Sequence, residues 1–259
     1  MKTLQFLIRY IRYFITAKNK HSAHSPFLYE FITKVLNNTS DNAYCKKIDH
    51  LRRKLYRSEK IITVNDFGAG SQINNSKKRK VKDIAKNSAK NSKFGKLLYR
   101  ITQFYNVQNS LELGTSFGIS TIYLANKKSK VYTLEGCQET ANIAKENFNQ
   151  MELKNIDLTL GDFKYTLDAT LKRINPLDLV FVDGNHQKEA TIQYFEKCLE
   201  HSNNNTIFIF DDIHWSNGME NAWKHIKSSK KTTLTIDLFF IGIVFIKSEL
   251  SKENYTIRF

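Results

Sequence analysis

The segment SLELGTSFGIST, residues 110–121, joins a short apolar run to a glycine-containing turn and the start of a helix. Glycines at positions 114 and 118 let the backbone of such a turn approach a ligand closely. After the helix comes a second apolar run that ends in an acid, Glu135. This order of strand, glycine turn, helix and strand with a terminal acid predicts the first half of an α/β unit that binds a small molecule.

From residue 110 onward, short apolar runs alternate with longer segments of helical period, which predicts parallel strands joined by crossover helices. We expect seven strands, at residues 110–113, 131–135, 158–160, 177–182, 206–210, 234–238 and 243–247. We expect helices between them, at residues 120–127, 138–150, 165–174, 187–201 and 217–228. Residues 239–242 are too few for a parallel crossover, so the last strand should be antiparallel.

The N-terminal part gives a less regular pattern. Helices are expected at residues 4–15, 26–36, 44–55 and 81–105, with an exposed lysine-rich loop within residues 71–86 that leads into the last of them. We therefore expect two parts: a basic helical extension at 1–94, packed on or capping the rest, and the α/β domain at 95–259.

Composition excludes several classes of protein. The 259 residues are 41% hydrophobic and 25% charged, which is typical of one or two globular domains. The three cysteines are far apart and form no CxxC pair, which favours a reducing, cytoplasmic location over a disulfide-stapled secreted protein. Arg9 and Arg12 interrupt the apolar N-terminus, so a signal peptide is not expected, and no segment has the length of a membrane span.

The net charge of +15 lies entirely in the N-terminal part. Residues 1–110 carry 23 Lys and Arg against 6 Asp and Glu, whereas residues 111–259 carry 17 against 19. Such an excess attracts nucleic acid, an acidic membrane surface or an anionic substrate. Solvated lysines without any partner are the simpler interpretation, and we favour it here.

Two glycine-containing stretches compete for the role of the binding turn. No strand is expected soon after Gly68 and Gly70, whereas a helix and then a strand follow the turn at Gly114 and Gly118. This second turn lacks the Gly-x-Gly-x-x-Gly pattern of NAD sites. The series Glu112-x-Gly114-x-x-x-Gly118, then Glu135, then Gly161-Asp162-Phe163, with an antiparallel seventh strand, resembles the class I S-adenosylmethionine-dependent methyltransferases. The alternative is that these are ordinary turn residues.

The resemblance implies a Rossmann-like α/β fold with a mostly parallel seven-stranded sheet, and S-adenosylmethionine as the cofactor. It places Glu112 near the methionine moiety, Asp162 at the adenine amino group and the neighbouring residue on the adenine ring. A carboxylate at Glu135 suits the ribose hydroxyls. The candidate cofactor residues are Glu112, Gly114, Thr115, Ser116, Gly118, Ser120, Thr121, Glu135, Gly136, Gly161, Asp162, Phe163 and Asp183.

Acids and histidines end the fourth and fifth predicted strands, where open α/β sheets bind ligands. Asp183, Asp211 and Asp212 resemble the metal-binding acids of cation-dependent O-methyltransferases of the catechol and caffeoyl-CoA type, and oxygen ligands suit Mg²⁺. The alternative is that Asp183 contacts only the cofactor and the Asp-Asp pair caps a helix. The catalytic candidates are Asp183, His186 and His214. Each histidine is either a general base or a residue that hydrogen-bonds the backbone at a helix start.

The expected function is therefore O-methylation of a small or medium-sized hydroxylated acceptor. An RNA methyltransferase is the main alternative, because of the basic N-terminal part. A membrane-peripheral enzyme, anchored by the helix at residues 4–15, and a non-enzymatic cofactor-binding module are further alternatives. Segments 21–27 and 66–71 are expected to form a lid over the site, and a homodimer is compatible with the sequence.

Overall fold

The computed structural model describes residues 2–18, 25–38, 42–65, 77–88, 91–126 and 129–259. Contacts divide the chain into two compact units: unit 1 comprises Met1–Asn37 and Pro176–Phe259, and unit 2 comprises Asn38–Asn175. Predicted segments 21–24 and 66–71 lie outside the described residues. The predicted division into 1–94 and 95–259 follows sequence pattern instead of contacts, and it stays a prediction.

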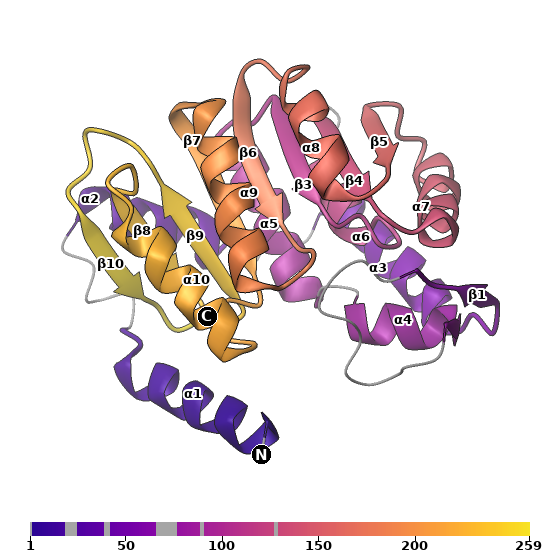
Figure 1. The fold of residues 1–259 in the computed structure, drawn as a ribbon, viewed down its shortest axis with the longest axis horizontal. Helices are drawn as coiled ribbons and strands as arrows, with labels where there is room; N and C mark the ends of the chain where they lie inside the picture. Colours follow the sequence, from indigo (N-terminus) through magenta and orange to yellow (C-terminus); the bar gives the residue numbers. More distant parts are fainter. Residues whose placement is uncertain (1, 19–24, 39–41, 66–76, 89–90, 127–128) are drawn as a thin grey trace. The chain divides into compact units, whose positions relative to one another are not determined.

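Unit 2 contains three parallel strands. They are β3 (Asn109–Leu113), β4 (Lys130–Glu135) and β5 (Ile156–Leu160), in the order β3-β4-β5. Figure 1 shows them side by side. The helices that follow them in the chain are α6 (Ile119–Leu124), α7 (Gln138–Gln150) and α8 (Phe163–Leu171). The predicted alternation of strands and helices is therefore confirmed here, with boundaries shifted by a few residues.

The remaining elements of unit 2 precede β3. They are α3 (Ala43–Leu55), β1 (Ile61–Thr63), β2 (Lys78–Lys80), α4 (Val81–Ser88) and α5 (Ser92–Phe104). Two expectations were wrong. The helix expected at 81–105 is two helices, because the Asn91 side chain accepts a hydrogen bond from the backbone of Lys93 and starts a new helix. The stretch expected as a loop contains β2, which pairs antiparallel with β1.

Among its described residues, unit 1 contains five strands. They are β6 (Leu177–Val182), β7 (Ser202–Asp211), β8 (Leu234–Asp237), β9 (Ile241–Phe245) and β10 (Glu253–Thr256), in the order β6-β7-β9-β8-β10. β9 runs antiparallel to both of its neighbours, so the expected antiparallel strand after residues 239–242 is confirmed. β10, which pairs parallel with β8, was not expected. Its sequence ENYT is short and polar, as edge strands often are.

Two helices follow β6 and β7 and complete the α/β part of unit 1. They are α9 (Lys188–Glu200) and α10 (Asn217–Ser228). Aromatic rings fill the core between helices and strands: Phe195 of α9 contacts Phe208 of β7 at a centroid distance of 5.2 Å, and Trp223 of α10 contacts Phe210 at 6.5 Å. These buried rings fix the helices over the strand ends that carry the candidate acids.

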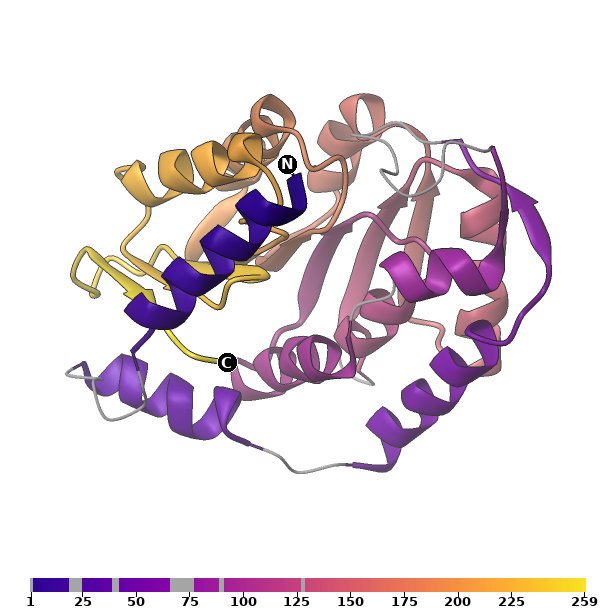
Figure 2. The ribbon, with the colours of Figure 1, turned by 90° about the horizontal axis from the view of Figure 1, so that it is seen from below.

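Helices from the N-terminal segment complete unit 1. They are α1 (Lys2–Thr16), α2 (Pro26–Glu30) and η2 (Phe31–Leu36), a π-helix that continues α2. Figure 2 shows α1 alongside the orange and yellow elements of unit 1, where its Phe6 contacts Phe239 at 5.3 Å. Rings of Phe27 and Phe31 pack on Phe245 of β9. Among the described residues, no helix has the length and apolar character needed to cross a membrane.

Candidate functional site

The turn after β3 begins at Gly114 and ends at Gly118, the residue before α6. The φ angles are 104° at Gly114, 48° at Ser116 and 78° at Gly118. Glycine takes such angles without strain, whereas Ser116 must be held there by its contacts. A side chain at position 118 would also place Cβ 2.3 Å from Cε1 of Phe148, so backbone angle and packing both require glycine.

Glu135, at the end of β4, holds this turn. One carboxylate oxygen accepts a hydrogen bond from the backbone N–H of Ser116 at 2.7 Å, and the other accepts from Cys137 at 2.8 Å. Burial raises the pKa of Glu135, and these N–H groups oppose the shift because they stabilise the charged form. Sequence analysis expected a ribose contact at this residue. The structure adds a second role, which is to join the end of β4 to the strained turn.

Glu112 lies fully buried in a cluster of threonines. Its Oε2 accepts hydrogen bonds from the hydroxyls of Thr121 and Thr133, and the hydroxyls of Thr133 and Thr115 are 2.6 Å apart. Glu112, Thr115 and Thr121 were all expected to contact the cofactor. The structure brings them together, and it adds Thr133, which sequence analysis missed. Position 133 lies inside an apolar run, so nothing in its spacing distinguishes it from a core residue.

The end of β5 is joined to β4 as well. The backbone N–H of Gly161, at a φ angle of 140°, donates a 2.8 Å hydrogen bond to the carbonyl of Glu135. Asp162 starts α8, and its Oδ1 accepts from the backbone of Lys164 at 2.9 Å. Asp162 and Phe163 are half-buried. Gly136, which directly follows β4, is half-buried, and Ser120 is buried in α6.

Unit 1 carries a separate group of acids and imidazoles at the ends of β6 and β7. Among the described residues, Asp183, His186 and Asp211 form the group whose ligand atoms all lie within 4.8 Å of one another. His186 Nε2 is 3.8 Å from Asp183 Oδ1. His186 also has a φ angle of 42°, an unusual backbone conformation that is common at functional sites.

The predicted metal set is only partly brought together. Asp212, its third member, is not in the group, and its backbone has a φ angle of 53°. Its N–H donates to the carbonyl of Phe240 at 2.7 Å and its carbonyl accepts from Trp215 at 2.9 Å. His186 takes the third place instead. The two carboxylates suit a divalent cation, and the imidazole beside them suits either a third ligand or a base.

His214 lies between two carboxylates. Its Nδ1 is 3.1 Å from Glu220 Oε1, and its Nε2 is 2.8 Å from Asp237 Oδ2, an oxygen that also accepts from the indole of Trp223. Burial lowers the pKa of His214, but the hydrogen bonds and charges of Asp237 and Glu220 outweigh burial and raise it. Because both ring nitrogens are engaged, this imidazole is better placed to hold α10 and β8 together than to accept a proton.

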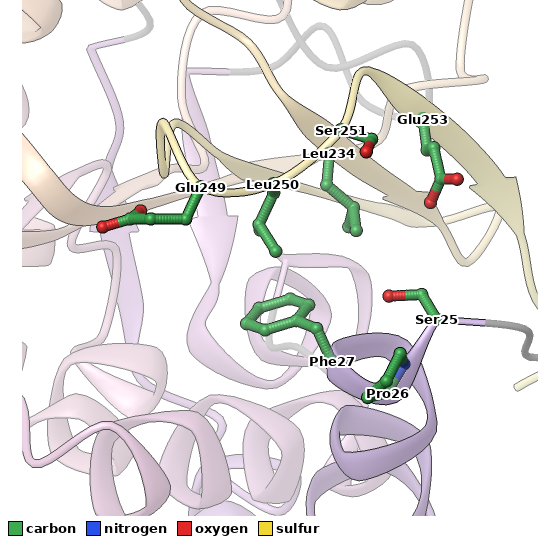
Figure 3. Close-up of a pocket in the computed structure, with 8 residues that line it drawn as sticks. All are labelled: Ser25, Pro26, Phe27, Leu234, Glu249, Leu250, Ser251 and Glu253. Carbon is green, nitrogen blue, oxygen red and sulfur yellow. The ribbon is translucent and has the colours of Figure 1, made fainter.

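A pocket of about 470 Å³ lies elsewhere in unit 1, as Figure 3 shows. Ser25, Pro26 and Phe27 line one side of it. Leu234 and Glu253 also line it, and they are the first residues of β8 and β10. The pocket therefore lies at the amino ends of these strands, whereas ligands in open α/β sheets bind at the carboxyl ends. The expected lid role of 21–27 gains no support from the three residues described.

Comparison with known proteins connects these features. Residues 111–213 match a family model described as a methyltransferase domain. The matched stretch includes the glycine turn, Glu135 and the acids that end β6 and β7. This stretch of the chain is similar to methyltransferase domains.

The matches to curated proteins cover part of the chain. Over 124 residues the chain is 29% identical to a catechol O-methyltransferase of Niastella koreensis, a match that covers 46% of this chain and 55% of that protein. A catechol O-methyltransferase of Mycobacterium tuberculosis is 27% identical over 123 residues, covering 46% and 54%. The chain thus spans about half the length of the curated relatives it matches.

Solved structures resemble a larger part of the chain. A methyltransferase of Podospora anserina bound to S-adenosylhomocysteine has a TM-score of 0.60 at 13% identity and covers 87% of this chain and 98% of its own. An O-methyltransferase of Bacillus cereus in complex with S-adenosylhomocysteine has a TM-score of 0.52 at 20% identity, covering 85% and 97%. The expected class I methyltransferase fold is confirmed, with β10 as an addition.

Proposed function

We propose that this methyltransferase domain binds S-adenosylmethionine and transfers its methyl group to a hydroxyl oxygen of a small acceptor. The observation that carries the proposal is the matched methyltransferase domain, whose glycine turn is held by an acid at the end of the next strand. Both curated relatives are catechol O-methyltransferases, which favours an acceptor with adjacent aromatic hydroxyls.

Unit 2 supplies the residues proposed to bind the cofactor. Glycines at both ends of the turn from Gly114 to Gly118 let its backbone approach a ligand closely, and the carboxylate of Glu135 is the group suited to ribose hydroxyls. Asp162 and Phe163, joined to β4 through Gly161, are proposed at the adenine. The buried Glu112 supports this arrangement through its threonines, and direct contact with the methionine moiety stays a prediction.

Unit 1 supplies the residues proposed for the chemistry. Asp183 and Asp211 would hold a divalent cation such as Mg²⁺, and the donor set fits one. A cation at this place lowers the pKa of an acceptor hydroxyl that binds to it. Asp212 is not a member of this group and is not proposed as a ligand.

His186 is the proposed proton acceptor. Its imidazole borders the two carboxylates, and imidazole is the side chain that most often serves as a general base. The acceptor oxygen attacks the methyl carbon as the carbon–sulfur bond breaks, and S-adenosylhomocysteine is the other product. The hydroxyl proton passes to Nε2 of His186. No covalent bond to the protein forms, so positioning and deprotonation are the contributions of this chain.

Formation of S-adenosylhomocysteine from S-adenosylmethionine and catechol, with and without Mg²⁺, tests the proposal. We expect the wild-type protein to turn over catechol and the Asp211→Asn variant to be inactive. Titration of Mn²⁺ separates the two roles: Asp211→Asn should weaken binding at least about tenfold, whereas His186→Gln should leave it nearly unchanged while reducing turnover. If His186→Gln also loses the metal, His186 is a ligand and another group takes the proton.

Several finer predictions stay with the proposal. A small-molecule acceptor is favoured over nucleic acid, although the basic residues before position 110 keep an RNA acceptor as the alternative. A cytoplasmic location, a homodimer and the helical extension at 1–94 rest on sequence pattern alone. If the acceptor is a small molecule, the protein should keep its full activity on catechol in the presence of excess RNA.

A further inference from the structure

Helix α1 has one face packed into unit 1. Tyr13 is buried, and its hydroxyl donates a 2.6 Å hydrogen bond to the carbonyl of Ile257. Arg9 Nε forms an ion pair of 3.0 Å with Glu220, one of the two carboxylates that hold His214. Phe6 completes this face on the ring of Phe239. These contacts at three successive turns fix the rotation of α1 about its own axis.

The other face of α1 carries a stripe of exposed large apolar residues. They are 47% to 75% exposed and consist of Leu4, Leu7, Ile8, Ile11, Phe14 and Ile15. Their spacing of three and four residues places them on one side of the helix. An isolated exposed leucine is ordinary, but six together on one helix face mark a surface that binds something apolar.

Exposed cations lie beside the C-terminal half of the stripe. Arg12 and Lys18 are exposed on α1 and just after it, and the exposed guanidinium of Arg258 lies 4.2 Å from the centre of the Phe14 ring. The sequence contains no aspartate or glutamate before Glu30. The partner of this surface should therefore be both apolar and negatively charged.

We propose that α1 binds the surface of an anionic membrane, with its axis in the plane of the bilayer. The apolar stripe lies among the lipid acyl chains near the headgroups, and Arg12, Lys18 and Arg258 bind lipid phosphates. At a rise of 1.5 Å per residue, a helix of 15 residues is about 22 Å long, too short to span the hydrocarbon core. A lipid surface fits better than a second copy, because two such helices would face each other with like charges.

Sedimentation with vesicles tests this proposal with the full-length chain. Wild-type protein should bind vesicles of phosphatidylglycerol and phosphatidylcholine and bind pure phosphatidylcholine much more weakly. Leu7→Ser with Ile11→Ser removes three carbons at each position and should weaken binding about tenfold or more. Arg12→Gln with Lys18→Gln should weaken it roughly 25-fold at low salt, because each cation contributes about fivefold.

Matched controls come from exposed residues outside α1. Ile61→Ser with Tyr165→Ser removes exposed apolar groups, and Lys145→Gln with Lys154→Gln removes exposed charges. Both controls should bind vesicles as wild type does. Circular dichroism verifies that each variant is folded. If Leu7→Ser with Ile11→Ser does not fold, Arg12→Gln with Lys18→Gln still tests the proposal.

Three outcomes would overturn the inference. Equal binding to both vesicle types removes the role of anionic lipid, and equal loss in the controls removes the role of α1. The third outcome is that wild type does not bind vesicles and forms a dimer in analytical ultracentrifugation, and that Leu7→Ser with Ile11→Ser converts this dimer to a monomer. This outcome assigns the stripe to a second copy of the chain. None of these measurements depends on methyl transfer, so the two proposals stand or fall separately.

Discussion

Replacing Gly118 by alanine gives a sharp test of the turn after β3. The new Cβ would lie 2.3 Å from Cε1 of Phe148 and 3.3 Å from Cβ of Ala144, two buried residues of α7. The left-handed φ angle of 78° costs about 1 to 2 kcal/mol for a residue with a Cβ. Forcing a methyl group into packed surroundings adds about 1 to 3 kcal/mol. We expect the free energy of unfolding to fall by about 2 to 5 kcal/mol.

Urea unfolding followed by circular dichroism measures this loss, and a double-mutant cycle separates its two parts. In a Phe148→Ala background the steric part disappears, so Gly118→Ala should then cost only about 1 to 2 kcal/mol. The matched control is Gly218→Ala in α10, where a Cβ would meet other atoms at 3.5 Å or more and should cause no loss. A loss below about 1 kcal/mol for Gly118→Ala, or the same loss in both backgrounds, would refute the reasoning.

Three other predictions concern buried polar groups. Glu135→Gln offers one acceptor to two backbone N–H groups, so unfolding titrations should show about 1 to 3 kcal/mol less stability, and calorimetry should show weaker S-adenosylmethionine binding. Thr133→Val removes a donor to the buried Glu112 and should cost at least about 1 to 3 kcal/mol in the same titrations. The pKa of His214 is raised above its usual 6.5 in the folded protein. Its bonds to Glu220 and Asp237 therefore stabilise the folded state fully below pH 6.5, and this stabilisation is lost as the pH rises through the raised pKa. The free energy of unfolding of His214→Asn, measured across this pH range, should lack this pH dependence. An unchanged pH dependence would contradict the role given to Asp237.

The strands were largely predictable from the sequence because burial on both faces leaves continuous apolar runs. Residues 177–182 form β6 with the expected boundaries, and every residue of β9 is buried. β10 was missed for the opposite reason, since its half-exposed residues ENYT carry no apolar pattern. The break between α4 and α5 depends on one capping side chain, Asn91, in a stretch that otherwise has helical period.

The candidate site was predictable where a residue's place in the chain fixes its role. Glu135 follows a strand and the glycines follow the previous one, so the sequence brings them together. The choice between Asp212 and His186 depends on backbone angles after the strands end, and two acids in a row give no sign of which one faces the group. The two bonds of His214 come from Glu220 and from Asp237, which is 23 positions away and on another strand, and periodicity contains no information about that pairing.

The bond between Tyr13 and Ile257 has a consequence for biosynthesis. Phe239 and Ile257, on which α1 packs, are translated 226 or more residues later than Tyr13. At about 5 to 20 residues per second, the helix waits roughly ten to fifty seconds for these partners. During that interval both of its faces are apolar and uncovered. Chaperones or a nearby bilayer would meet the nascent helix long before unit 1 can form.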